Sequence, residues 1–87
     1  MNELMLVEWE DSSQPTSSWR YLSDAPDLEV IQCVSVGWVI NESDRVLLLA
    51  SNIGDYESGD GAQGCGFMRI PKASITRTTR LLETTSS

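Results

Sequence analysis

Residues 31–50, IQCVSVGWVINESDRVLLLA, constrain the fold of this chain more than any other stretch. Two apolar runs, the first rich in β-branched residues, flank the four polar residues NESD at 41–44. β-branched side chains favour strands over helices, and a short polar connection between two such runs is typical of a β-hairpin. We therefore predict paired strands over 30–40 and 45–50 as the structural centre of the fold.

A glycine and a tryptophan lie inside the first of these strands. Gly37 predicts either a bulge or a close approach by another group, and it would let the strand bend to serve two layers of a small barrel. Trp38 follows in the most apolar segment of the chain. We predict that Trp38 lies in the core, and that Trp9, at the end of an earlier apolar segment, does the same.

Three further segments are predicted to be strands, at 3–9, 66–70 and 75–82. Between the last two, PKAS at 71–74 has the length of one 3₁₀ turn, with the proline fixing the first φ angle. Three more segments complete the chain. They are the polar loop EDSSQPTSS at 10–18, a short extended return at 19–22, and a long acidic loop with four glycines at 51–64.

This order of elements predicts an all-β fold, because no segment of ten or more residues has a period of 3.6. Five short strands with one 3₁₀ turn before the last predict an SH3-like barrel. The alternative is an OB-like barrel, which usually carries a helix between its third and fourth strands, where this chain has the glycine-rich loop. The 87 residues suit one domain. We predict a barrel over 1–83 and a disordered polar tail over 84–87.

The composition argues against catalysis. There is no histidine, which removes the usual general base near neutral pH and the commonest metal ligand. No phosphate-binding loop motif occurs, and the stretch DYESGDG does not have the spacing of a calcium loop. The cysteines, Cys33 and Cys65, are predicted to be small buried residues. A disulfide between them is the alternative if their strands are neighbours. We predict a protein that is not an enzyme and that needs neither metal nor cofactor.

The charge is strongly negative and uneven. The chain has 13 acidic and 6 basic residues and a net charge of −7, which disfavours nucleic-acid binding. All but one of the acidic residues precede residue 61, whereas four of the six basic residues follow it. We therefore expect ion pairs between the late basic residues and Glu8, Glu10 or Asp44 on neighbouring strands rather than a free basic stripe.

The candidate binding residues are aromatic and acidic side chains in two loops. Loop aromatics beside acids resemble in composition the groove of a peptide-binding barrel, and Trp and Tyr dominate interface energetics. Trp19 has a second possible role, which is to cap the end of the barrel. The predicted contact residues are Trp19, Tyr21, Asp24, Asp55, Tyr56, Glu57 and Asp60.

Three motifs follow one another along the chain: WEDS at 9–12, SVGW at 35–38 and GFMRIPKASI at 66–75. With these motifs the chain resembles a group of small proteins that are encoded by tailed bacteriophages and prophages. The resemblance implies a source, and a fold consistent with the strands and 3₁₀ turn predicted above, but no mechanism.

Together these features predict a phage-encoded protein-binding module, for instance an acidic inhibitor of a host or defence protein that handles nucleic acid. The first alternative is a phage structural or assembly component that self-associates through apolar strand faces. The second is a small nucleic-acid-binding protein. The acidic start of the chain and the absence of an apolar run of about 20 residues predict the host bacterial cytoplasm, with no membrane association.

Overall fold

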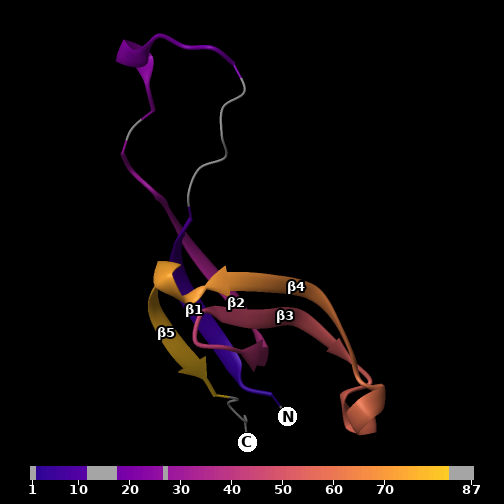
Figure 1. Ribbon diagram of the computed structural model, residues 1–87. Coiled ribbons are helices and arrows are strands. Elements are labelled where there is room, and N and C mark those ends of the chain that lie inside the picture. The colour runs from indigo at the N-terminus through magenta and orange to yellow at the C-terminus, as the bar shows by residue number, and fades with distance from the viewer. Residues whose placement is uncertain (1, 12–17, 27, 83–87) are drawn as a thin grey trace, which may run out of the picture.

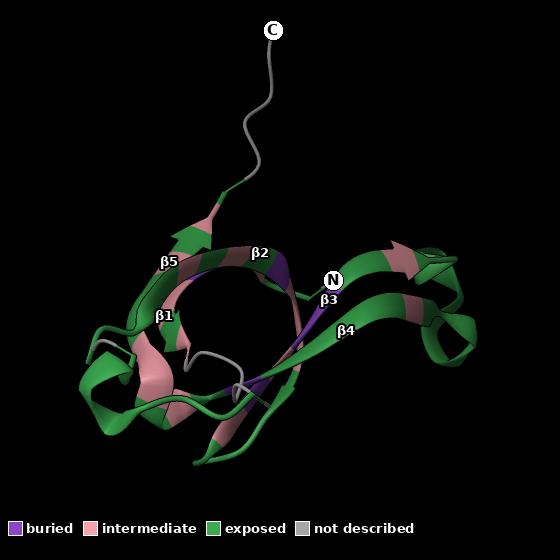
Figure 2. Ribbon diagram, turned by 90° about the horizontal axis from the view of Figure 1, so that it is seen from above, coloured by how far each residue is buried: buried purple, intermediate pink, exposed green. Residues whose placement is uncertain are grey.

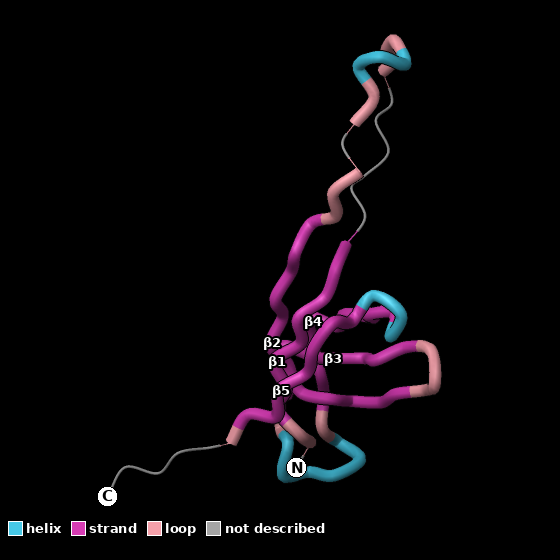
Figure 3. Tube along the Cα trace, turned by 90° about the vertical axis from the view of Figure 1, so that its left-hand side faces the viewer, coloured by secondary structure: helices cyan, strands magenta, loops and turns pink. Residues whose placement is uncertain are grey.

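The computed structural model describes residues 2–11, 18–26 and 28–82. It is a single antiparallel sheet in the order β4-β3-β2-β1-β5 (Figure 1). The strands are β1 (Leu4–Asp11), β2 (Ile31–Glu42), β3 (Val46–Gly54), β4 (Gln63–Pro71) and β5 (Ile75–Leu81). Three 3₁₀ segments, cyan in Figure 3, lie at separate places: η1 (Leu22–Asp24), η2 (Tyr56–Gly61) and η3 (Lys72–Ser74). The prediction of an all-β fold with a 3₁₀ turn before the last strand is confirmed.

The sheet is coiled but does not close. β2 pairs with β1 over Ile31–Trp38 and with β3 over Trp38–Glu42. β2 therefore passes from one partner strand to the other near Trp38, and the sheet bends there. β4 and β5 are the two outer strands of the order, and no ladder joins them in the part of the chain that the structure describes. The barrel expected from the sequence is therefore open.

An OB-like barrel would usually carry a helix between its third and fourth strands. That position holds η2, a short 3₁₀ segment whose backbone is interrupted at Gly59. Residues 2–11, 18–26 and 28–82 contain no α-helix. The structure therefore favours the SH3-like order over the OB-like one.

The core is small. Its buried members come from β1, β3 and β4, and the buried stretches in Figure 2 are correspondingly short. The buried side chains are Val7, Leu47, Leu49, Ala50 and Ile70, and the partly buried ones packed against them are Met5, Trp9, Val39 and Ile75. Trp9 thus lines the core as predicted, and its indole Nε1 donates a 3.0 Å hydrogen bond to the hydroxyl of Ser35.

The prediction for Trp38 is wrong. Trp38 is only half-buried and lies directly opposite Leu4 of β1 and Ala50 of β3, outside the core cluster. The face of β2 that turns inward is the one with Gly37 and Val39. The larger side chains of β2 therefore lie on the outer face of the sheet.

Gly37 explains this choice of face. A Cβ atom at Gly37 would lie 3.0 Å from the carbonyl oxygen of Ala50 and 3.1 Å from the Cβ of Leu49. These distances are shorter than nearly all real Cβ contacts, and one of the two neighbours is backbone that cannot rotate away. The close approach predicted for this glycine is confirmed, and it lies where β2 exchanges one partner strand for the other.

Replacing Gly37 with alanine should lower the free energy of unfolding by about 1–3 kcal/mol, because the added methyl overpacks the contact with β3. The matched control is Gly54→Ala, whose Cβ would meet nothing closer than 3.9 Å. Urea denaturation of the two variants checks this. Equal midpoints for the two would show that β3 does not press on Gly37.

Several boundaries differ from the prediction. The NESD turn is confirmed, and Ser43 organises it: its backbone N–H donates to the oxygen of Val46, and its hydroxyl accepts from the N–H groups of Arg45 and Val46. The predicted loop 51–64, however, is shorter than expected, because β3 runs on to Gly54 and β4 begins at Gln63. The extended return at 19–22 does not form a strand. Parts of the predicted first loop (12–17) and the whole predicted tail (84–87) lie outside the described residues.

Candidate interaction surfaces

The hairpin of β1 and β2 carries residues 18–26, which we call the hairpin tip, far from the core (Figure 1). Two local backbone hydrogen bonds shape it: the N–H of Asp24 donates to the oxygen of Tyr21 at 2.9 Å, and that of Ala25 to the oxygen of Leu22 at 3.2 Å. The tip is thus a single 3₁₀ turn between extended residues, with no side chain holding it to the sheet among the contacts of the described residues.

The large side chains of the hairpin tip lie almost wholly in solvent. Trp19 is 101% exposed, Tyr21 82% and Leu22 93%. Trp19, Arg20, Tyr21 and Asp24 together line a shallow depression. The second role considered for Trp19, that it caps the barrel, is therefore wrong: its ring covers nothing.

The other four predicted contact residues lie in and beside η2, which we call the η2 tip. Asp55 precedes it in the left-handed region at φ 53°, and Tyr56, Glu57 and Asp60 belong to it. Tyr56 is 55% exposed. The N–H of Ser58 donates to the oxygen of Asp55 at 3.0 Å and closes the first turn. The η2 tip is thus an exposed acidic turn with one aromatic ring.

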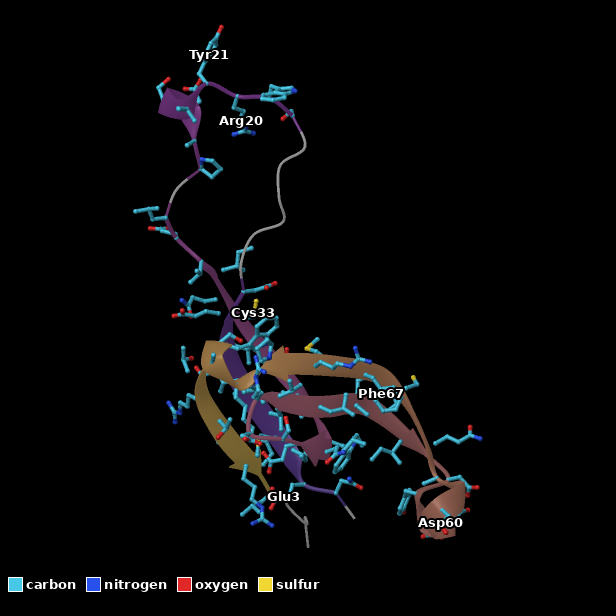
Figure 4. The ribbon with its side chains drawn as sticks, in the orientation of Figure 1. Glu3, Arg20, Tyr21, Cys33, Asp60 and Phe67 are labelled. Atoms are coloured by element: carbon cyan, nitrogen blue, oxygen red, sulfur yellow. The ribbon has the colours of Figure 1, made fainter. Side chains whose placement is uncertain are left out.

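The structure does not bring the seven predicted residues together. Figure 4 shows Tyr21 and Asp60 at opposite ends of a molecule whose longest dimension is 58 Å. The two hairpins leave the coiled sheet in different directions, so each tip is a surface of its own (Figure 1). A partner that contacted both tips at once would have to span most of this length.

Among the described residues, three ion pairs link the acidic and basic parts of the chain. Lys72 Nζ lies 2.8 Å from a carboxylate oxygen of Glu42, and Arg77 Nε lies 3.6 Å from one of Glu8. Arg80 Nη1 lies 3.6 Å from a carboxylate oxygen of Glu3. The pairing predicted for Glu8 is confirmed; Glu10 and Asp44 are not among the ion pairs of the described residues. Three of the four late basic residues are therefore already engaged, which weakens the case for a nucleic-acid surface.

The sequence reasoning missed an apolar surface on the outside of the sheet. Val34 of β2 is 64% exposed, Val36 49%, and Phe67 of β4 57%. The signal for it was present in the smaller side chains on the opposite face of β2. At Gly37 they let β3 approach so closely that larger side chains do not fit on that face. A second missed feature is a hollow lined by four apolar and four polar residues: Met5, Val39, Leu47 and Ile75, and Glu3, Glu42, Lys72 and Thr78.

Among the residues that the structure describes, no group of three or more Cys, Asp or Glu side chains is placed to hold a metal ion. Both cysteines are free; Cys33 is half-buried and Cys65 is exposed. The prediction that both are buried is wrong for Cys65, which lies opposite Asn52 where the β3–β4 hairpin extends beyond the core. In the same part of the chain, no helix combines the length and apolar character needed to cross a membrane.

Known proteins do not narrow these candidates. Comparisons with family models, with curated proteins and with solved structures find no match. The choice between the surfaces therefore depends on their exposure, charge and position in the fold.

Proposed function

We propose that this chain is a protein-binding module whose main contact is the hairpin tip. The observation that carries the proposal is the exposure of Trp19, Tyr21 and Leu22 at the end of a projecting hairpin. Burying one large apolar side chain is worth about 1.5–3 kcal/mol, and this chain has few buried residues of its own. Aromatic residues held in water at such a position are typical anchors of an interface.

The sequence at and just after the hairpin tip indicates the partner's chemistry. Arg20 and Asp24 balance each other within 18–26, but residues 18–30 as a whole hold one base and three acids, because Asp27 and Glu29 follow. The complementary surface is an apolar pocket with a basic rim, which is the kind of surface expected on a protein that handles nucleic acid. With the resemblance to phage proteins, this supports an inhibitor that acts in the host bacterial cytoplasm by occupying such a pocket, without catalysis or a cofactor.

The η2 tip has a different role in this proposal. Its acidic residues Asp55, Glu57 and Asp60 are exposed and lie far from the aromatic anchors. Charges outside an interface act mainly on the rate of association, through long-range attraction. The triple variant Asp55→Lys, Glu57→Lys, Asp60→Lys is therefore expected to slow association and to leave dissociation unchanged.

The test is capture of partners from infected-host lysate by the full-length chain, identification by mass spectrometry, and affinity measurement with the purified partner. The double variant Trp19→Ala, Tyr21→Ala should bind at least about tenfold more weakly, because it removes both aromatic anchors. Its circular dichroism should not change, since neither ring contacts the core. Affinity should also fall as salt rises.

The matched control is Tyr56→Ala, which removes an exposed aromatic ring from the η2 tip. It should bind like the unchanged chain. Unchanged affinity in the Trp19→Ala, Tyr21→Ala variant would refute the proposal, and loss of affinity in Tyr56→Ala alone would move the contact to the η2 tip.

The exposed outer face favours a second candidate function, that of a phage assembly component that self-associates. Three apolar side chains on two different strands are each about half exposed or more: Val34 and Val36 on β2, and Phe67 on β4. Association through apolar surface holds or strengthens as salt rises, whereas binding of the acidic segment 18–30 to a basic surface weakens. The salt dependence therefore separates the two functions.

A further inference from the structure

The first half of β2 is a sheet edge in the middle of the chain. Over Ile31–Gly37, β2 pairs with β1 on one side, and its pairing with β3 begins only at Trp38. In the part of the chain that the structure describes, no strand pairs with the other side of residues 31–37. Within the described residues, one side-chain hydrogen bond links this half of β2 to β4: the Ser35 hydroxyl donates to the Met68 sulfur at 3.5 Å, and no backbone group of β2 takes part.

The direction of the free backbone groups follows from one hydrogen bond. The N–H of Val39 donates to the oxygen of Glu3, the residue just before β1, at 2.8 Å. Backbone groups alternate in direction along a strand, so the odd residues of β2 point their N–H and C=O groups at β1. The even residues Gln32, Val34 and Val36 consequently point theirs away from β1, into the open edge.

This edge lacks the features that usually protect one. Natural edge strands carry charges, prolines or bulges that prevent further pairing. Residues 31–40 contain no charged residue and no proline, although 22% of the chain is charged. Val34 is 64% exposed and Val36 49%, so the side chains beside the free groups are accessible too. An open, uncharged and β-branched edge is suited to receive another strand.

We propose that two copies of this chain associate by antiparallel pairing of their β2 edges, with Val34 on the two-fold axis. In that register the two Val34 residues exchange N–H···O=C bonds, and Gln32 of each copy faces Val36 of the other. The pattern is self-complementary, as an interface between identical chains requires. An edge without charge has no side chain that would select a charged peptide, and this favours a second copy as the occupant.

The net charge of −7 does not oppose this dimer at physiological salt. The nearest acidic side chain on the same face is Glu8, which lies opposite Val34 on β1 and is paired with Arg77. In the dimer the two β1 strands would be three strand spacings apart, or about 14 Å. That exceeds the Debye length of about 8 Å at 0.15 M salt, so the repulsion is largely screened.

The test is sedimentation of the full-length chain over a range of protein and salt concentrations. We expect a reversible dimer that strengthens as salt rises, the opposite of binding by the hairpin tip. Val34→Lys should raise the dimer dissociation constant at least about tenfold, because it places two lysines side by side on the axis. Phe67→Lys makes the same change of charge on an exposed residue of β4 and should change it little.

A cross-link gives a second readout that does not depend on the lysine variant. In a background of Cys33→Ser and Cys65→Ser, Val34→Cys places two thiols across a hydrogen-bonded strand pair. The expected Cα separation is about 5.5 Å, which a disulfide can bridge. Diamide should therefore yield a covalent dimer of Val34→Cys and not of Phe67→Cys.

Three results would overturn the proposal. They are a chain that sediments as a monomer at about 100 µM, where even a small interface is populated, a Val34→Cys variant that does not cross-link, and equal loss of the dimer in Phe67→Lys and Val34→Lys. The last would place the interface on the sheet face rather than the edge. None of these results bears on the hairpin tip, whose partner is measured separately.

Discussion

Replacing Ile70 with alanine should lower the free energy of unfolding by about 2–5 kcal/mol. Ile70 is fully buried and packs among Val7, Leu47 and Leu49 in the centre of the core. A domain of this size has a total stability of only roughly 4–13 kcal/mol, and a core with so few buried side chains cannot collapse far to fill the space. The melting temperature should fall by roughly 10 °C or more.

The control is Leu28→Ala, because Leu28 is 103% exposed and its removal leaves no cavity. Its effect should stay within about 0.5 kcal/mol. Thermal and urea unfolding, followed by circular dichroism, measure both variants. A melting temperature of Ile70→Ala within a few degrees of the unchanged chain would mean that the buried cluster does not hold the sheet together.

Replacing Gly66 with alanine should cost about 2–4 kcal/mol, from two separate causes. Gly66 has a φ of 70°, a left-handed conformation that alanine adopts only with strain. Gly66 also lies across from Ser51, so a Cβ atom there would collide with the Ser51 hydroxyl and approach its Cβ to 3.1 Å. The first cause is local to the backbone of β4, and the second involves β3.

A double-mutant cycle separates these two causes. Ser51→Gly in the Gly66→Ala background removes the collision and leaves the backbone strain, so it should recover part of the lost stability and not all of it. Urea denaturation of the four proteins gives the coupling. Full additivity of the two substitutions would show that Ser51 and Gly66 do not press on each other.

The central hairpin and the order of the strands could be predicted from the sequence. The apolar runs around NESD, the threonine-rich last strand and the proline before its 3₁₀ turn are all local signals, and each lies where the structure has the matching element. The ends of β3 and β4 could not be predicted in this way. Apart from Ile53 and Cys65, the residues there are polar or glycine, yet pairs such as Asn52 with Cys65 continue the ladder, because a paired strand overrides a weak propensity.

The inward face of β2 was harder to predict than the strand itself. Hydrophobicity alone points the valines and Trp38 at the core. In the structure these side chains lie on the outer face instead. β3 passes so close to Gly37 that only the face of β2 with small side chains fits against it. The separation of the two tips was also beyond the sequence, since it depends on how the whole sheet coils. These two facts decide which surfaces are exposed, and therefore the candidate sites.

The pairing of β1 with β5 has a consequence for biosynthesis. The neighbour of β1 on one side, Ile75–Leu81, is the last of the five described strands to be synthesised, about seventy positions after the first. Hairpins β1–β2 and β3–β4 can form earlier, but the ladder between β1 and β5 cannot form until residues 75–81 have left the ribosome. A nascent chain therefore carries one side of β1 as an unpaired edge until β5 emerges, and a transcript cut short before codon 75 would leave that edge unpaired permanently.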